Sequence, residues 1–248
     1  MSEDGGARTR RSSGATGIAI GGVQWTTLID YPGKVAATVF TIGCSFRCPF
    51  CHNPELVDPV RYAPEQDELA LYERLRDRTG FLDGVVITGG EPTLQPALVP
   101  FVERIKDLGL LVKLDTNGAR PDVLSAILAA DLVDYVAMDV KAPLDAYERL
   151  TGVACDVGWI EESIEHIRSA APDYEFRTTV APTLQREDIL RIADHLAGAK
   201  RFFLQAFRVP ESGLLDPTWG GKTALPKAEL EGLWAELRPR FLDGGVRG

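Results

Sequence analysis

Three of the four cysteines in this sequence lie close together, and their spacing is the feature best suited to carry chemistry. Cys44, Cys48 and Cys51 form a C-x3-C-x2-C pattern directly after the apolar run at residues 35–42. A loop with this spacing can direct three thiolates at one point, and thiolates bind iron–sulfur clusters or zinc rather than hard cations. Three cysteines with no obvious fourth favour a [4Fe–4S] cluster with one iron open to a non-protein ligand, because an open position distinguishes a reactive metal site.

Two other interpretations of the cysteines stay open. A structural zinc site of the Cys3His type would use His52, although zinc ligands usually lie two to four residues apart and His52 directly follows Cys51. Disulfides are possible in principle with four cysteines. We expect no secretory signal, however, and closely spaced cysteines in a cytosolic chain more often bind metal or do redox chemistry.

The cysteine loop resembles that of the radical S-adenosylmethionine (SAM) superfamily. Three segments, GVQWTTLIDYPGK at 22–34, FTIGC at 40–44 and CHNPEL at 51–56, are similar to one branch of it. That branch contains the activating proteins of anaerobic ribonucleoside-triphosphate reductase, which are relatives of the pyruvate formate-lyase activating enzyme. The resemblance runs from about Gly21 to about Pro210 and is most specific at the cysteines.

The resemblance implies an enzyme, a radical SAM oxidoreductase of the activating type. Such an enzyme reductively cleaves SAM at a [4Fe–4S] cluster, and the 5′-deoxyadenosyl radical abstracts a glycine Cα hydrogen from its partner. The implied partners are a glycyl radical enzyme, anaerobic ribonucleoside-triphosphate reductase, and a flavodoxin- or ferredoxin-type electron donor. The alternatives are activation of another glycyl radical enzyme such as pyruvate formate-lyase, and a short radical SAM enzyme acting on a small molecule, similar to carboxy-deazaguanine synthase. A zinc-binding interaction module is the alternative from a different class.

Length and composition limit the other possibilities. A chain of 248 residues with 45% hydrophobic content can bury one core, which fits a single α/β domain over residues 17–248. A net charge of −9 argues against nonspecific nucleic-acid binding, and no apolar run is long enough to cross a membrane. Residues 1–16 are rich in Gly, Ser, Thr and Arg, so we expect a disordered tail. We expect a cytoplasmic protein.

Strand-like and helix-like segments alternate along the chain. Residues 17–22 and 25–29 predict an entry hairpin with its turn at Gly21 and Gly22. Core strands are expected at residues 35–42, 84–88, 110–115, 135–139, 175–180 and 201–206. Helices are expected at residues 64–78, 95–108, 121–130, 159–171, 187–197 and 226–240. This alternation predicts parallel strands with right-handed crossovers. Six strands are too few to close a barrel, in agreement with the partial (β/α)6 barrel that the resemblance implies.

Unusual polar residues follow the ends of the expected strands. Gly89, Gly90 and Glu91 end the second strand, Asp115 the third, and Asp139 with Lys141 the fourth. Sites in parallel α/β folds assemble at these carboxyl ends. Two successive glycines allow a close backbone approach, and we expect Glu91 to present its carboxylate and carbonyls to an ammonium group.

The resemblance assigns roles to these residues. It implies that Gly89, Gly90 and Glu91 contact the amino group of SAM and that Asp139 and Lys141 contact its ribose and carboxylate region. Asp115, Thr116 and Asp139 match a monovalent-cation site of the pyruvate formate-lyase branch. That branch also places a His near SAM after the sixth strand, where this chain offers Gln205 or Phe207.

Arg177 lies inside the fifth strand between apolar neighbours. Its fork could hold the carboxylate of SAM, with a salt bridge across the barrel as the alternative. Phe46, Phe50 and His52 are expected to shield the cluster, and the match at His52 and Asn53 implies that Phe50 and Asn53 contact the cofactors. Three further residues are expected to have no catalytic role: His166 and His195 on helices, and Cys155 as a small buried side chain.

Overall fold

One eight-stranded sheet organises the fold. The computed structural model describes residues 17–248, so the tail predicted at residues 1–16 lies outside the described part. The strands neighbour one another in sequence order, and every pair is parallel except the antiparallel pair β1–β2. They are β1 (Ile20–Thr27), β2 (Ala36–Thr41), β3 (Gly84–Gly89), β4 (Leu111–Thr116), β5 (Tyr135–Asp139), β6 (Tyr174–Val180), β7 (Arg201–Ala206) and β8 (Asp243–Arg247).

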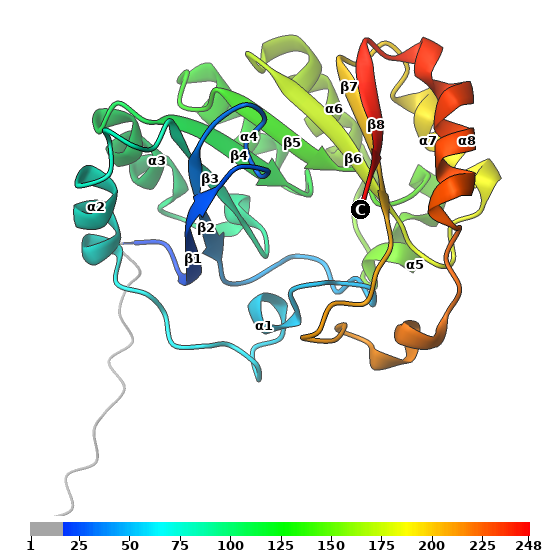
Figure 1. The fold of residues 1–248 in the computed structure, drawn as a ribbon, viewed down its shortest axis with the longest axis horizontal. Helices are drawn as coiled ribbons and strands as arrows, with labels where there is room; N and C mark the ends of the chain where they lie inside the picture. Colours follow the sequence, from blue (N-terminus) through cyan, green and yellow to red (C-terminus); the bar gives the residue numbers. More distant parts are fainter. Residues whose placement is uncertain (1–16) are drawn as a thin grey trace, which may run out of the picture.

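The sheet is curved and does not close. Within residues 17–248, β1 pairs only with β2 and β8 only with β7, which leaves two free edges. Figure 1 shows the sheet curling round a concave face, with the longer helices on its convex side. The helices are α1 (Pro54–Val57), α2 (Glu68–Arg76), α3 (Leu98–Asp107), α4 (Pro121–Ala129), α5 (Tyr147–Thr151), α6 (Val157–Ala170), α7 (Arg186–His195) and α8 (Lys227–Leu237). The predicted partial α/β barrel is therefore confirmed.

All six predicted core strands form, as β2 to β7, and their bounds agree with the prediction to within one residue at each end. Their apolar runs are buried on both faces, as in β3, where Val85, Val86 and Ile87 have no exposed surface. In such a sheet one face packs against helices and the other faces the barrel interior. Because both faces are buried, continuous apolar runs identify the strands.

The entry hairpin differs from the prediction. Gly21 and Gly22 lie inside β1 and make no turn, because β1 runs on to pair antiparallel with β2. The turn follows Thr27, whose Oγ1 accepts hydrogen bonds from the N–H groups of Ile29 (3.3 Å) and Asp30 (3.2 Å). A hydroxyl-based turn of this kind takes the place of the predicted glycine turn.

β8 was not predicted, because its glycine-rich sequence reads as a turn. The strand forms where its last residue has a strong partner: both terminal nitrogens of Arg247 donate to the Glu175 carboxylate, at 2.7 and 2.8 Å. Gly244 allows the close approach to β7, since a Cβ there would lie 2.0 Å from the carbonyl oxygen of Phe202. The sheet thus has seven parallel strands rather than six.

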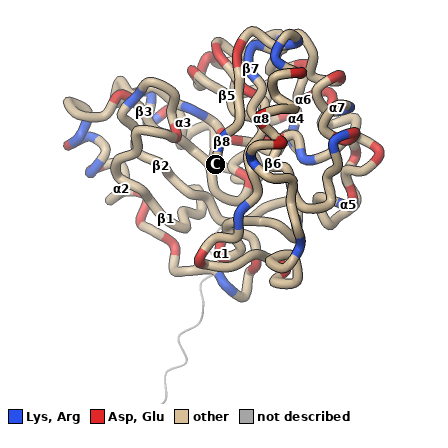
Figure 2. Tube along the Cα trace, turned by 45° about the vertical axis from the view of Figure 1, so that its right-hand side comes forward, with Lys and Arg blue, Asp and Glu red and all other residues tan. Residues whose placement is uncertain are grey.

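The observed helix ends differ from the predicted ones by a few residues, most clearly in α2. This helix begins at Glu68 rather than at Pro64, because the Asp67 side chain caps it by accepting from the N–H groups of Leu69 and Ala70. The short helices α1 and α5 were not predicted. No helix among the described residues is long and apolar enough to span a membrane. Figure 2 shows acidic and basic residues interspersed along the chain.

Candidate active site

The cysteine loop leaves β2 at the carboxyl end of the parallel strands. Two main-chain hydrogen bonds fix its path: Arg47 N–H donates to the Thr151 carbonyl at the end of α5 (2.7 Å), and Cys51 N–H donates to the Cys48 carbonyl (3.0 Å). The structure brings the thiols of Cys44, Cys48 and Cys51 to the wall of one cavity of about 250 Å³, which we call the cluster cavity.

The alternatives for the cysteines gain nothing from the structure. All four cysteines are free thiols, so the possible disulfides are not formed. Within residues 17–248, no three His, Cys, Asp or Glu side chains converge on a position for a single metal ion.

The thiols lie in surroundings that disfavour an unneutralised thiolate. Burial raises the pKa of Cys44 to about 11 and that of Cys48 to about 12, and burial also raises the pKa of Cys51. The ammonium group of Lys141 acts in the opposite direction on all three. Thiolates in such a place require further positive charge, which a metal centre supplies.

Aromatic side chains close the cluster cavity from the outside. Phe46 is buried with its ring centroid 6.3 Å from that of Tyr147, and Phe50 is buried with its centroid 5.8 Å from that of Trp219. His52 also lines the cavity, and its buried Nε2 has no hydrogen-bond partner among the described residues. Burial lowers the pKa of His52, which favours the neutral imidazole.

The Gly89–Gly90 turn packs directly against the start of the cysteine loop. Gly90 N–H donates to the Thr41 carbonyl (2.9 Å), and Glu91 N–H donates to the Gly43 carbonyl (2.8 Å). A Cβ on Gly90 would lie 2.0 Å from the Gly43 oxygen, and Gly89 has a φ of 116°. Both glycines are therefore required for this close approach, and Gly89 lines the cluster cavity.

Glu91 is arranged differently from the expectation. Its carboxylate does not line the cluster cavity; it is fully buried behind the turn. It accepts four hydrogen bonds, from N–H and Oγ1 of Thr93 (3.1 and 2.6 Å), Oγ1 of Thr116 (2.8 Å) and N–H of Asn117 (2.6 Å). A buried carboxylate that accepts three hydrogen bonds through one oxygen and a fourth through the other is a brace between β3 and β4 rather than a free partner for an ammonium group.

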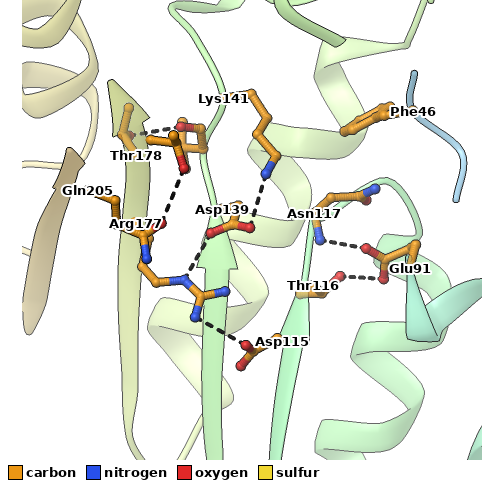
Figure 3. Close-up of polar contacts among 12 residues, drawn as sticks. Phe46, Glu91, Asp115, Thr116, Asn117, Asp139, Lys141, Arg177, Thr178 and Gln205 are labelled. Carbon is orange, nitrogen blue, oxygen red and sulfur yellow. Dashed lines mark hydrogen bonds and ion pairs between the residues drawn. The ribbon is translucent and has the colours of Figure 1, made fainter. Parts of the chain in front are cut away.

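Four predicted residues meet in one row of alternating charges, near the carboxyl ends of β4 and β5 and at the middle of β6 (Figure 3). Arg177 donates through Nε to Asp139 (2.9 Å) and through a terminal nitrogen to Asp115 (3.1 Å). Lys141 donates to the second oxygen of Asp139 (3.0 Å). Lys113, a fully buried lysine, pairs with Asp115. We call these five residues the charge ladder.

The charge ladder keeps its two carboxylates and Lys141 ionised. Burial by itself would raise the pKa of Asp139, but the charges of Arg177 and Lys141 outweigh it and hold the pKa well below its usual value. The pKa of Asp115 is lowered in the same way, against burial, by Arg177 and Lys113. Against the effect of burial, Asp139 raises the pKa of Lys141. The salt bridge considered as the alternative for Arg177 is thus present.

The ladder leaves no unpaired carboxylate for a monovalent cation. Asp115 and Asp139 each contact two cationic side chains, and Thr116 donates its hydroxyl proton to Glu91. A cation here would be repelled by three positive charges set against two negative ones. The expected cation site at Asp115, Thr116 and Asp139 is therefore not supported.

A second, larger cavity of about 630 Å³ adjoins the first; we call it the lateral cavity. The two share His52, Arg177, Thr179 and Gln205 on their walls. The lateral cavity lies between the turn after β1, which contributes Ile29, and the end of β8, which contributes Arg247. It thus runs from the cluster cavity towards the open side of the sheet.

Of the remaining predicted residues, some line the cavities and others do not. Asn53 lines the cluster cavity just before α1, and Gln205 lines both cavities, where it accepts from the Thr179 hydroxyl (3.3 Å). Phe207 instead stacks near His52, with centroids 6.1 Å apart. The side chains with no expected catalytic role differ in burial: His195 is exposed, His166 is half-buried, and Cys155 is half-buried rather than buried.

Lys113 and Asn117 are site residues that sequence reasoning missed. Lys113 lies two residues before Asp115 on β4, so strand alternation was a signal that both face the barrel interior. Asn117 lies two residues after Asp115, in the segment Asp-Thr-Asn-Gly at residues 115–118. Its Nδ2 donates to Sγ of Cys44 (3.7 Å), which no sequence signal specifies.

The side chains around the cluster cavity fit an iron–sulfur cluster. Three thiols share one wall, and Cys44 Sγ already accepts hydrogen bonds from Phe46 N–H (3.4 Å) and Asn117 Nδ2 (3.7 Å), as a negatively charged sulfur requires. Lys141 and Arg177, which line the same cavity, suit an anionic group of a bound cosubstrate.

Comparison with known proteins identifies the class of enzyme. Residues 38–196 match the family model described as Radical SAM superfamily, and the chain belongs to that superfamily. It is 34% identical over 196 residues, which are 76% of this chain and 79% of the relative, to a putative glycyl-radical enzyme activating enzyme, MJ1227, of Methanocaldococcus jannaschii. It is 30% identical over 176 residues, 67% of this chain and 71% of the relative, to the pyruvate formate-lyase-activating enzyme of Clostridium pasteurianum. The chain is thus an enzyme of the glycyl-radical enzyme activating type.

Two further similarities are more limited. The chain is 35% identical over 133 residues to the 7-carboxy-7-deazaguanine synthase of Methanopyrus kandleri, which covers 46% of this chain and about half, 52%, of that relative. The crystal structure of Streptococcus suis SuiB bound to the precursor peptide SuiA matches with a TM-score of 0.63 at 16% identity. That match covers 84% of this chain and 47% of SuiB, and it shows a shared fold.

Proposed function

We propose that this enzyme installs a glycyl radical on anaerobic ribonucleoside-triphosphate reductase, using SAM and a [4Fe–4S] cluster held by Cys44, Cys48 and Cys51. One observation carries the proposal: the three free thiols line the same cavity as Asp139, Lys141 and Arg177. Metal ligands and groups that recognise a charged cosubstrate therefore meet at one place. The similarity to named activating enzymes supports the reaction class.

The charged side chains would bind and orient SAM. Cys44, Cys48 and Cys51 would hold the cluster, which would supply the electron for reductive cleavage of SAM and so the radical chemistry needed to take a hydrogen from a glycine Cα. Lys141 and Arg177 face the cluster cavity as permanent cations, and with Lys113 they exceed the two ladder carboxylates by one positive charge. That surplus suits one ligand carboxylate. Gly89 and Gly90 leave room for the ligand beside the cysteine loop.

The lateral cavity is the proposed entrance for the glycine-bearing segment of the partner. It joins the cluster cavity through shared wall residues and lies between the β1 turn and β8, at the open side of the sheet. An extended loop of another protein fits an opening between two strand edges better than a closed pocket would. The choice of the reductase as partner rests on the resemblance of residues 22–34 and 51–56.

The electron source and the compartment follow from the same chemistry. We propose a flavodoxin- or ferredoxin-type donor, because the proposed reaction consumes one electron for each SAM cleaved. The four free thiols support a reducing compartment, the cytoplasm, in which an oxygen-sensitive cluster can be assembled.

Substitution of one cluster ligand tests the proposal, and the fourth cysteine provides a matched control. Protein reconstituted with iron and sulfide without oxygen should be brown and should form 5′-deoxyadenosine from SAM and dithionite. Cys48→Ala should lose this activity, whereas Cys155→Ala, outside the cluster cavity, should keep it. Full SAM cleavage by Cys48→Ala would refute the cluster assignment. A colourless, zinc-loaded protein would favour the zinc-binding module.

The partner is tested separately. Mixing the reduced, SAM-loaded enzyme with the reductase should give the electron paramagnetic resonance doublet of a glycyl radical on the reductase. A doublet on another glycyl radical enzyme, with none on the reductase, would show that the other enzyme is the partner. The similarity to 7-carboxy-7-deazaguanine synthase keeps a small-molecule substrate as the second candidate. That candidate requires product formation with no protein partner present.

A further inference from the structure

Asn117 is the one side chain within residues 17–248 that donates a hydrogen bond to a sulfur of the cysteine loop. Its Nδ2 lies 3.7 Å from Sγ of Cys44 and 3.2 Å from Oγ of Ser45. We propose that Asn117 tunes the reduction potential of the cluster through this hydrogen bond, an inference that rests on the cluster of the proposed function. Asn117 is thus a positioning residue for electron transfer rather than a ligand.

The surrounding hydrogen bonds decide which end of the Asn117 amide faces the sulfur. Its Oδ1 accepts from the main-chain N–H of Ala119 (2.9 Å). A main-chain N–H can only donate, so the amide oxygen must lie on that side. The NH2 group therefore points to Cys44 and Ser45, and the contact with the sulfur is a donated hydrogen bond.

Glu91 fixes the position of Asn117 from the other side (Figure 3). Its fully buried carboxylate accepts the Asn117 main-chain N–H at 2.6 Å and the Thr116 hydroxyl at 2.8 Å. Because Glu91 N–H is bonded to the Gly43 carbonyl, this residue joins the Asn117 turn to the start of the cysteine loop. The distance from donor to sulfur is therefore set by rigid, buried contacts.

A donor at this sulfur favours the reduced cluster. Reduction adds one negative charge, which spreads over the sulfurs, and the positive end of an N–H dipole stabilises it. Cys44 Sγ has two such donors, Asn117 and the main-chain N–H of Phe46 at 3.4 Å. A side-chain substitution can remove only the first. Asn117 and Phe46 are both buried, which leaves little water to replace the donor.

The test is a potentiometric titration of the reconstituted cluster, followed by electron paramagnetic resonance. Asn117→Ala removes the donor; Asn117→Asp keeps an acceptor for Ala119 N–H but turns a carboxylate oxygen towards the sulfur. The cluster of both variants should be harder to reduce, with the equilibrium constant for its one-electron reduction roughly three- to tenfold lower. A tenfold change corresponds to a shift of about 59 mV in the reduction potential. Ser45→Ala, which removes the other contact of the Asn117 amide, should keep the parent potential.

A second readout separates tuning from general damage. In the parent, an exchangeable proton should couple to the reduced cluster in electron–nuclear double resonance, and Asn117→Ala should lose that coupling after exchange into D2O. Unchanged potentials in both variants would overturn the inference while leaving the proposed function intact. Failure of both variants to retain iron, with Ser45→Ala loaded, would also overturn it by showing a role in assembly. If the parent forms no cluster, the proposed function itself fails.

Discussion

Replacing Arg177 by methionine should destabilise the protein strongly, because Arg177 connects the two carboxylates of the charge ladder. Removing one partner of a buried ion pair costs about 3–5 kcal/mol. Arg177 is 13% exposed and makes two such pairs, with Asp139 at 2.9 Å and Asp115 at 3.1 Å. Lys141 and Lys113 remain beside these carboxylates, which places the expected loss near the lower end, about 3 kcal/mol.

The assay is thermal unfolding of the metal-free protein, followed by circular dichroism under anaerobic conditions. For a chain of this size, 1 kcal/mol lowers the Tm by roughly 2–4 °C, so Arg177→Met should lower it by about 6–12 °C. The control is Arg191→Met, which removes an exposed pair with Asp145. An exposed pair contributes about 0–1 kcal/mol, so the control should change the Tm by only a few degrees.

The pH dependence of the loss identifies its cause. The pKa of Asp139 and that of Asp115 are held below their ordinary values in the folded protein. Such groups add stability above the unfolded pKa of about 3.9, and that contribution is lost as the pH falls through the folded pKa. The deficit of Arg177→Met should therefore be complete at neutral pH and shrink below about pH 4. A loss no larger than that of Arg191→Met, or a loss independent of pH, would refute this reasoning.

Two further substitutions test the contact between the Gly89–Gly90 turn and the cysteine loop. Gly90→Ala places a methyl group 2.0 Å from the Gly43 oxygen, so it should lower the free energy of unfolding by about 1–3 kcal/mol and reduce the iron bound per chain. Urea unfolding and iron analysis measure the two effects. The control is Gly22→Ala, because Gly22 has open space around it. Both oxygens of Glu91 accept hydrogen bonds, so Glu91→Gln sets an NH2 group against at least one N–H or O–H donor, and the urea midpoint should fall by the equivalent of about 1–3 kcal/mol. Parent-like stability of Glu91→Gln would show that this carboxylate is not a brace.

The sheet could be predicted because parallel, fully buried strands have an unambiguous sequence pattern. Residues 85–87 are all apolar and the segment ends at two glycines, Gly89 and Gly90, and the structure places β3 there with its neighbours in parallel register. Strand ends located Asp115 and Asp139, and the structure brings Arg177, predicted within the neighbouring strand, into contact with both. Local pattern and topology were sufficient for this part of the site.

The rest depended on contacts between residues far apart in the sequence. The sequence predicts that Glu91 faces an ammonium group, and only the fold shows that Thr116 at the end of β4 and Asn117 just after it donate to its carboxylate. β8 reads as a turn because two glycines lie in five residues, and its pairing depends on Arg247 meeting Glu175, 72 residues earlier. No local propensity encodes such partners.

The unpredicted strand also determines which carboxylates Arg177 can use. Three acidic residues lie within reach of its guanidinium: Asp115, Asp139 and, at 4.0 Å, Glu175. Arg247 at the end of β8 occupies both oxygens of Glu175, and the Tyr135 hydroxyl donates to the same group at 2.9 Å. Because Glu175 is already neutralised, Arg177 turns to the two ladder carboxylates and stays at the boundary between the cluster cavity and the lateral cavity. Pairing of β8 with the sheet edge and orientation of the central arginine therefore both depend on the same buried glutamate, Glu175.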